Sequence, residues 1–206
     1  MTHIEISRRD RKKEETRQRI FKAAIGLFRE KGFEATTVDE ITERADVAKG
    51  TFFNHFPRKE SVLNYLSEQR YEEAEANAEG ILAAERPARQ KLVELFTDAA
   101  RAYAQDRDLS RFVLTELLQM QFSPAKENGQ RWDELVAQVF EQGQRAGELR
   151  RDVTPDRAIA LLTAVYFSLL FMWACCIDEV IDLESEMKGR LSLVLDGLDA
   201  RAEVRS

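Results

Sequence analysis

Apolar residues recur at helical spacing along almost the whole chain, and this periodicity limits the possible folds more than any other feature. One stripe runs through Ile20, Ala24 and Leu27, and another occupies residues 183–198. Residues three and four apart lie on one face of a helix. Alternating β-branched runs are nearly absent, and only 9 Gly and 4 Pro interrupt 206 residues. The chain is therefore expected to be all-α.

Capping and breaking residues divide the chain into about nine expected helices. Gly32 ends the first, and Thr37 with Glu40 forms a T-x-x-E capping box at the start of the second. Pro57 ends the third, because the residue before a proline is pushed out of the helical region. The expected ranges are about 10–31, 38–46, 48–55, from near 58 onward, 88–105, 109–122, 130–146, a long helix starting at Pro155, and 183–198.

Charge is distributed unevenly along the sequence. The net charge is −6, yet residues 1–60 carry 14 Lys and Arg against 11 Asp and Glu, a net of +3, and the remainder carries −9. Such asymmetry is typical of an anion-binding end on an acidic body, although a solubilising basic tail gives the same pattern. The shift in composition predicts a small domain at 1–60 and a larger one at 61–206.

Two short helices at 38–46 and 48–55, joined by a tight turn in which Val47 is expected to be buried, form a helix-turn-helix pattern with the first helix as support. Steps of 100° per residue place Ala48 and Phe52 on an inward face. The opposite, outward face of this helix carries side chains that are suited to contact a DNA groove. An ordinary helical hairpin has the same periodicity, so that alternative stays open on spacing alone. The outward residues are Lys49, Gly50, Phe53 and Asn54.

The stretch from Arg17 to Leu63 resembles the DNA-binding domain of the tetracycline-repressor (TetR) family. Three motifs match in order: F-x-x-x-G-F at the end of the first helix, A-T-T-V-x-x-I at the entry to the second, and V-x-K-G-T-F-F-N-H-F-P-x-K-E through the third. So many ordered matches over about 47 residues are far more specific than a single short motif.

The resemblance implies a regulator whose third helix lies in the major groove of double-stranded operator DNA. Thr37 and Lys59 would contact phosphates. Ala48 and Arg58 stand where the family commonly has Ser, which should weaken two helix caps by about 1 kcal/mol each. The positions that would touch DNA are Arg17, Thr37, Lys49, Gly50, Thr51, Phe53, Asn54, His55 and Lys59.

Twenty residues from Ala158 to Ile177 carry no charge, which is the length of a membrane span. A helix buried in a core and dimer interface has the same composition. The run AGELRRDVTPDRAIALL is similar to the entry of the family's eighth helix, and the last two helices of that family usually form the dimer interface. The resemblance therefore implies a homodimer through the last two helices, a palindromic operator and no membrane span. A cytoplasmic location is expected from the low cysteine content and from the charged first thirty residues.

Large apolar side chains of the larger domain are candidates for an effector pocket, although such residues are more often core. They suggest an apolar or aromatic effector that favours a dimer whose recognition helices no longer match the groove spacing. The candidates are Phe96, Tyr103, Phe112, Met120, Trp132, Phe140, Phe167 and Phe171.

Catalysis, a cofactor and a metal are not expected. The two histidines are His3, in a terminal tail, and His55, in the helix-turn-helix, and no nucleophile–base motif or Gly-rich phosphate loop is present. Cys175 and Cys176 are adjacent and do not form a zinc or redox spacing. Two alternatives stay open: an activator, or a small-molecule-binding protein with weak or vestigial DNA binding.

Overall fold

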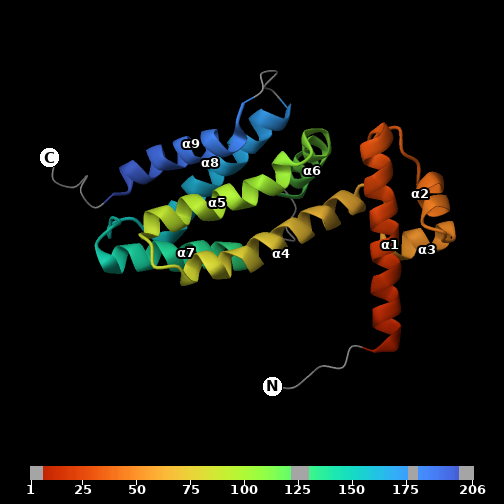
Figure 1. Cartoon of the computed structure of the whole chain (residues 1–206), viewed down its shortest axis with the longest axis horizontal. Helices are drawn as coiled ribbons and strands as arrows, with labels where there is room; N and C mark the ends of the chain where they lie inside the picture. The colour runs from red at the N-terminus through yellow and green to blue at the C-terminus, as the bar shows by residue number, and fades with distance from the viewer. Residues whose placement is uncertain (1–6, 122–129, 176–180, 200–206) are drawn as a thin grey trace. The chain divides into compact units, whose positions relative to one another are not determined.

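The computed structural model describes residues 7–121, 130–175 and 181–199; the side chains of 118–121 are outside this description. Across that part the chain folds into helices without a named strand, which confirms the all-α prediction (Figure 1). The chain divides into two compact units, Met1–Leu66 and Ser67–Ser206, whereas composition suggested a division at residue 60. The helices are α1 (Arg8–Lys31), α2 (Val38–Arg44), α3 (Lys49–His55), α4 (Ser61–Ala83), α5 (Ala88–Ala104), α6 (Arg107–Gln121), α7 (Gln130–Ala146), α8 (Pro155–Cys175) and α9 (Leu183–Gly197).

Local capping explains the helix ends of the first unit. Gly32 ends α1 with φ of +88°, a conformation that an L side chain rarely adopts, and its N–H donates to the carbonyl of Phe28. At the start of α2, the Glu40 N–H donates to Thr37 Oγ1 over 3.3 Å, and the Thr37 N–H donates to Glu40 Oε2 over 2.9 Å. The expected capping box is thus confirmed.

An aromatic cluster forms the centre of the first unit. Phe52 and Phe56 are almost completely buried, and their ring centroids lie 5.9 Å apart. Phe56 in turn contacts Tyr65, and Tyr65 meets Phe21 edge-to-face at 5.1 Å. These contacts join residues of α1, α3 and α4 within the unit, so the orientation of α3 depends on the burial of Phe52.

The turn between α2 and α3 differs from the expectation at two positions. Val47 is only half-buried, and Ala48, expected to face inward, is exposed. Ala48 is the N-cap residue with an extended backbone (φ −70°, ψ 148°), so helical steps of 100° do not apply to it. The preceding Asp46 has φ of +50°, which redirects the chain into α3.

In the second unit, α5 is the central helix. It packs against α9 and α7, and also against α6 and α8 (Figure 1). Among the described residues, α8 alone is long and apolar enough to cross a membrane. Nevertheless it packs against α6, α7 and α9, and its Leu162, Leu169 and Leu170 are fully buried in the core. One side of α8 thus belongs to the core of this unit.

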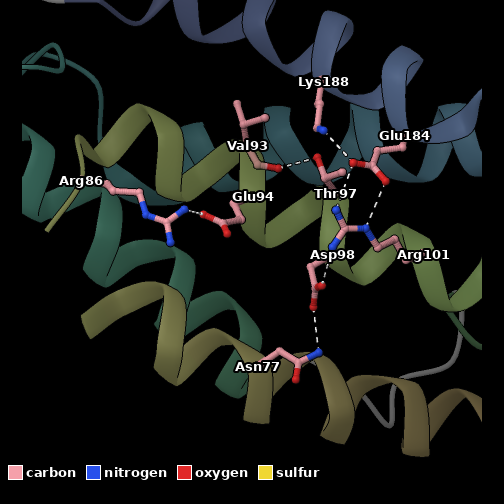
Figure 2. Close-up of polar contacts among 9 residues, drawn as sticks. All are labelled: Asn77, Arg86, Val93, Glu94, Thr97, Asp98, Arg101, Glu184 and Lys188. Carbon is pink, nitrogen blue, oxygen red and sulfur yellow. Dashed lines mark hydrogen bonds and ion pairs between the residues drawn. The ribbon is translucent and has the colours of Figure 1, made fainter. Parts of the chain in front are cut away.

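Polar contacts on α5 connect it to both α4 and α9 (Figure 2). The Asp98 carboxylate accepts from Asn77 of α4 over 2.8 Å and from Arg101 over 3.2 Å. Arg101 also donates twice to Glu184 of α9, at 3.1 and 3.0 Å, and Lys188 donates to the same carboxylate. The hydrogen bonds from Arg101 and then Lys188 lower the pKa of Glu184 to about 2. This chain of contacts fixes α9 on α5.

Gly143 of α7 lies close to Ala88 and Leu149. A Cβ at this position would lie 2.7 Å from Ala88 Cβ and 2.7 Å from Leu149 Cδ1. We expect Gly143→Ala to destabilise the protein, because overpacking costs about 1–3 kcal/mol whereas Ala gains at most about 1 kcal/mol in a helix. Urea unfolding followed by circular dichroism measures the change. Gly80→Ala is the control, since a Cβ there meets nothing within 4 Å and should leave stability unchanged or higher; a stabilising Gly143→Ala would contradict the packing described.

Candidate functional site

One face of α3 is directed to solvent and carries the side chains that sequence spacing placed there. Lys49, Gly50 and Asn54 are exposed, and Phe53 has 44% of its surface exposed. The neighbouring Phe52 is fully buried, so the helix separates a core face from an outer face within seven residues. An exposed phenylalanine on a polar face is unfavourable in water and is suited to a partner surface.

Gly50 and Lys49 each have a feature that favours an external partner. A Cβ at Gly50 would meet no atom within 4 Å, so packing within the chain does not require glycine there. The Lys49 ammonium forms an ion pair with Asp39 of α2 at 2.7 Å, and both side chains are exposed. Exposed ion pairs contribute little stability, so a phosphate can replace the Asp39 carboxylate at low cost.

Thr37 and Lys59, the residues expected on phosphates, have partners within their own unit. The Thr37 side chain takes part in the capping box described above. Lys59 Nζ donates to the carbonyl oxygens of Phe33 over 2.8 Å and Thr36 over 3.0 Å, and it lies 4.3 Å from the centroid of the Phe33 ring. Lys59 therefore ties the start of α4 to the loop before α2, and its contact with phosphate stays a prediction.

Arg17 and His55 lie beside the aromatic cluster. The Arg17 guanidinium carbon is 3.9 Å from the centroid of the Tyr65 ring, a cation–π contact that holds the arginine against the unit. Burial, together with the charges of Lys13 and Arg17, lowers the pKa of His55. His55 is thus neutral near pH 7, and its buried Nδ1 has no hydrogen-bond partner in the described part of the chain.

The second unit contains a cavity of about 480 Å³ lined by residues of α4, α5, α7 and α8. This volume is within the range that small-molecule sites occupy. Phe96 is at the centre of its aromatic wall, since its ring centroid lies 5.6 Å from those of both Trp132 and Tyr166. Burial raises the pKa of Tyr166 well above its usual value, so its phenol stays protonated.

Of the residues predicted from the sequence to line a pocket, Phe96, Tyr103, Trp132 and Phe167 line this cavity. Three others do not line it. Phe140 is fully buried in the packed core, and Phe112 and Phe171 are half-buried elsewhere. The side chain of Met120 lies outside the described residues.

Sequence reasoning missed the polar residues of the cavity, among them Arg70, Tyr71 and Thr163. Arg70 lies in an acid-rich helix, where a charged side chain is ordinarily solvated. The sequence offers no signal that distinguishes this arginine from its exposed neighbours. Its burial depends on tertiary contacts, since its guanidinium lies against Tyr103 of α5 and Ser110 of α6.

Comparisons with known proteins agree with the two-unit architecture. The sequence profile of bacterial regulatory proteins of the tetR family matches residues 20–66, and that of the C-terminal domain of TetR/AcrR family transcriptional repressors matches residues 68–197. Together the two profiles cover both units.

Individual proteins that are similar to this chain are also transcriptional regulators. FadR of Thermus thermophilus, a TetR-family transcriptional repressor solved in complex with lauroyl-CoA, is 33% identical, with a TM-score of 0.74 over 88% of this chain and 94% of that one. The repressor KstR2 of Rhodococcus jostii is 25% identical over 186 residues, 88% of this chain and 90% of that protein. The uncharacterised regulator YerO of Bacillus subtilis is 47% identical over 49 residues, which span only 17% of its length.

A helix-turn-helix with an exposed recognition face, followed by an all-helical unit that encloses a cavity, defines a DNA-binding transcriptional regulator. Both profiles and the similarity to FadR specify the group: the chain belongs to the TetR family. Members of this family regulate transcription and are not enzymes, which agrees with the sequence prediction.

Proposed function

We propose that this protein is a repressor that binds a palindromic operator as a homodimer, in the cytoplasm, and is released by a small apolar or aromatic effector. The observation that supports DNA binding most strongly is the outer face of α3, where Lys49, Gly50, Phe53 and Asn54 are exposed together. In a major groove, Lys49 would contact a phosphate, Asn54 a base edge or phosphate, and Phe53 a thymine methyl group or a sugar.

The homodimer is supported by apolar side chains that the second unit leaves exposed. The described residues expose four large apolar side chains, and apart from Phe53 all of them lie on α8 and α9. Leu193 has 73% of its surface exposed, Leu161 51% and Met172 39%. Exposed apolar side chains gathered on two adjacent helices are typical of an interface. A dimer through α8 and α9 would present two recognition helices about one DNA turn apart, which is why a palindrome is expected.

The effector role is supported by the cavity and by relatives. Several aromatic side chains line the cavity, and the related FadR of T. thermophilus was solved with lauroyl-CoA bound. Residues 61–66 of α4 belong to the first unit and residues 67–83 belong to the second. A ligand that contacts the second part of α4 therefore contacts the same helix whose first residues belong to the DNA-binding unit. We expect the ligand to shift the population of dimers away from the DNA-binding conformation.

Lys49→Ala tests the placement of the recognition face. We expect weaker operator binding and a smaller salt dependence, with the slope of log K against log salt reduced by about one, because one phosphate contact is lost. Fluorescence anisotropy with operator DNA at several salt concentrations measures both. Lys22→Ala is a suitable control, since Lys22 is an exposed lysine of α1 away from α3 in the sequence. An unchanged affinity and slope for Lys49→Ala would refute the placement.

A further inference from the structure

The cavity of the second unit is lined by a buried cation that forms no ion pair with the described residues. Arg70 of α4 lines the cavity and has only 9% of its surface exposed. Its Nη2 donates a long hydrogen bond of 3.4 Å to Ser110 Oγ. Its Nη1 is buried and has no hydrogen-bond partner in the described part of the chain. No described carboxylate forms an ion pair with this guanidinium, and the groups that contact it are the Ser110 hydroxyl and the Tyr103 side chain.

Burying the charged Arg70 guanidinium costs free energy unless an anionic or hydrogen-bonding partner compensates for the lost water. Burial lowers the pKa of Arg70, and the nearby Asp106 carboxylate partly opposes that effect. An arginine guanidinium keeps its proton in proteins, so the charge remains. Its carbon lies 4.4 Å from the centroid of the Tyr103 ring, and this cation–π contact offsets part of the desolvation. An unused N–H donor on a buried cation is suited above all to an anion.

A second unsatisfied polar atom lies on the wall formed by α8. Thr163 lines the cavity, and its Oγ1 is buried without a hydrogen-bond partner among the described residues. Threonine hydroxyls within helices usually donate to the carbonyl four residues earlier. Thr97 of α5 does so to Val93 over 2.6 Å (Figure 2), and Thr115 of α6 does so to Arg111. Thr163 lacks this bond, so its buried hydroxyl is an unsatisfied polar group in a residue that lines the cavity.

The other residues that line the cavity indicate how many charged groups the ligand carries. The lining combines aromatic and aliphatic side chains with polar ones, and its acidic residues Asp133, Glu134 and Asp156 are exposed. A ligand with a single anionic group avoids most of this repulsion by placing that group at Arg70. A polyanion, such as a coenzyme A thioester, would bring several phosphates close to the three carboxylates.

We propose that the cavity binds an apolar monocarboxylic acid in its free, ionised form, held at its carboxylate by Arg70 Nη1 and Thr163 Oγ1. The hydrocarbon body lies among the aromatic side chains. The role of this acid as the effector rests on the proposed function. The binding of the acid to the cavity does not require the protein to bind DNA.

Isothermal titration calorimetry on the full-length protein tests the site. The probes are dodecanoate and 4-phenylbutyrate, each compared with the corresponding alcohol, and lauroyl-CoA. We expect at least one acid to bind wild-type protein at least about tenfold more tightly than its alcohol and than lauroyl-CoA, because a charge-assisted hydrogen bond is lost in the alcohol.

Three variants assign the effect to the two polar groups. Arg70→Met should weaken acid binding by about 10- to 100-fold and leave alcohol binding unchanged, since the stem of the side chain is retained. Thr163→Val should weaken acid binding by less than Arg70→Met does. Arg107→Met is the matched control: Arg107 also stacks on an aromatic ring, that of Trp173, but it does not line the cavity, so acid binding should be unchanged. Circular dichroism confirms that each variant is folded.

Four results would overturn the proposal: neither acid binds, the alcohols bind as tightly as the acids, lauroyl-CoA binds more tightly than dodecanoate, or Arg70→Met leaves acid binding unchanged. Operator binding, measured separately by anisotropy, keeps the two proposals apart. Acid binding without release of operator would refute the effector role and leave the site intact. Absence of operator binding would refute the proposed function without bearing on the acid site.

Discussion

Phe52→Ala is expected to destabilise the DNA-binding unit by about 3–5 kcal/mol, the cost of truncating a fully buried phenylalanine. Phe52 has no exposed surface, contacts the rings of Phe53 and Phe56, and fixes the inner face of α3. Since small domains are stable by only about 5–15 kcal/mol, this substitution should remove a large fraction of the unit's free energy of unfolding. Urea unfolding followed by circular dichroism measures the loss.

The adjacent Phe53 provides the matched control. Phe53→Ala removes a side chain of the same size that is 44% exposed, so we expect a change in the free energy of unfolding below about 1 kcal/mol. Operator affinity should nevertheless fall, because the proposed contact with the groove is lost. If the two substitutions destabilised the protein equally, the assignment of an inner and an outer face to α3 would be wrong.

Leu193→Glu is expected to convert the proposed homodimer into monomers. In a two-fold symmetric interface each substitution acts twice, and burying an unpaired carboxylate in place of an apolar contact costs about 2 kcal/mol or more each time. The dimer dissociation constant should therefore rise roughly 1,000-fold. Sedimentation velocity at micromolar protein measures this, and operator affinity should fall in parallel because two recognition helices no longer bind together.

Ala76→Glu is the control for the added charge. Ala76 is exposed on α4, outside the proposed interface, so this variant should sediment like the wild-type protein. If Leu193→Glu remained a dimer, the exposed apolar residues of α8 and α9 would not form the interface. The identification as a transcriptional regulator would still hold, because it depends on both sequence profiles and not on this surface.

Helix boundaries that depend on local chemistry could be predicted from the sequence. The capping box at Thr37 fixes the start of α2 at Val38, and α7 spans residues 130–146 as expected. The sequence predicts a start of α4 near residue 58, which is too early. Residues 58–60 form a turn whose carbonyls accept from N–H groups three residues later, so the regular helix begins at Ser61. Such a turn has the same composition as a first helical turn, and sequence pattern does not separate the two.

Features that depend on tertiary packing could not be predicted. Phe140 and Phe96 are both apolar residues of the larger unit, yet one lies in the packed core and the other faces the cavity. Arg70 has the sequence context of a solvated residue, and its burial follows from the packing of other helices around it. Ala48 was wrongly placed inward because helical spacing was extended to a cap residue with an extended backbone.

The central claim is sequence-specific binding of operator DNA, and fluorescence anisotropy tests it most directly. The wild-type protein is titrated against the intergenic DNA beside its own gene and against a shuffled sequence of the same composition, at two salt concentrations. We predict nanomolar binding to the native DNA that persists at the higher salt concentration, because specific contacts add to the electrostatic attraction. Weak binding to both DNAs that disappears at the higher salt concentration would contradict the claim.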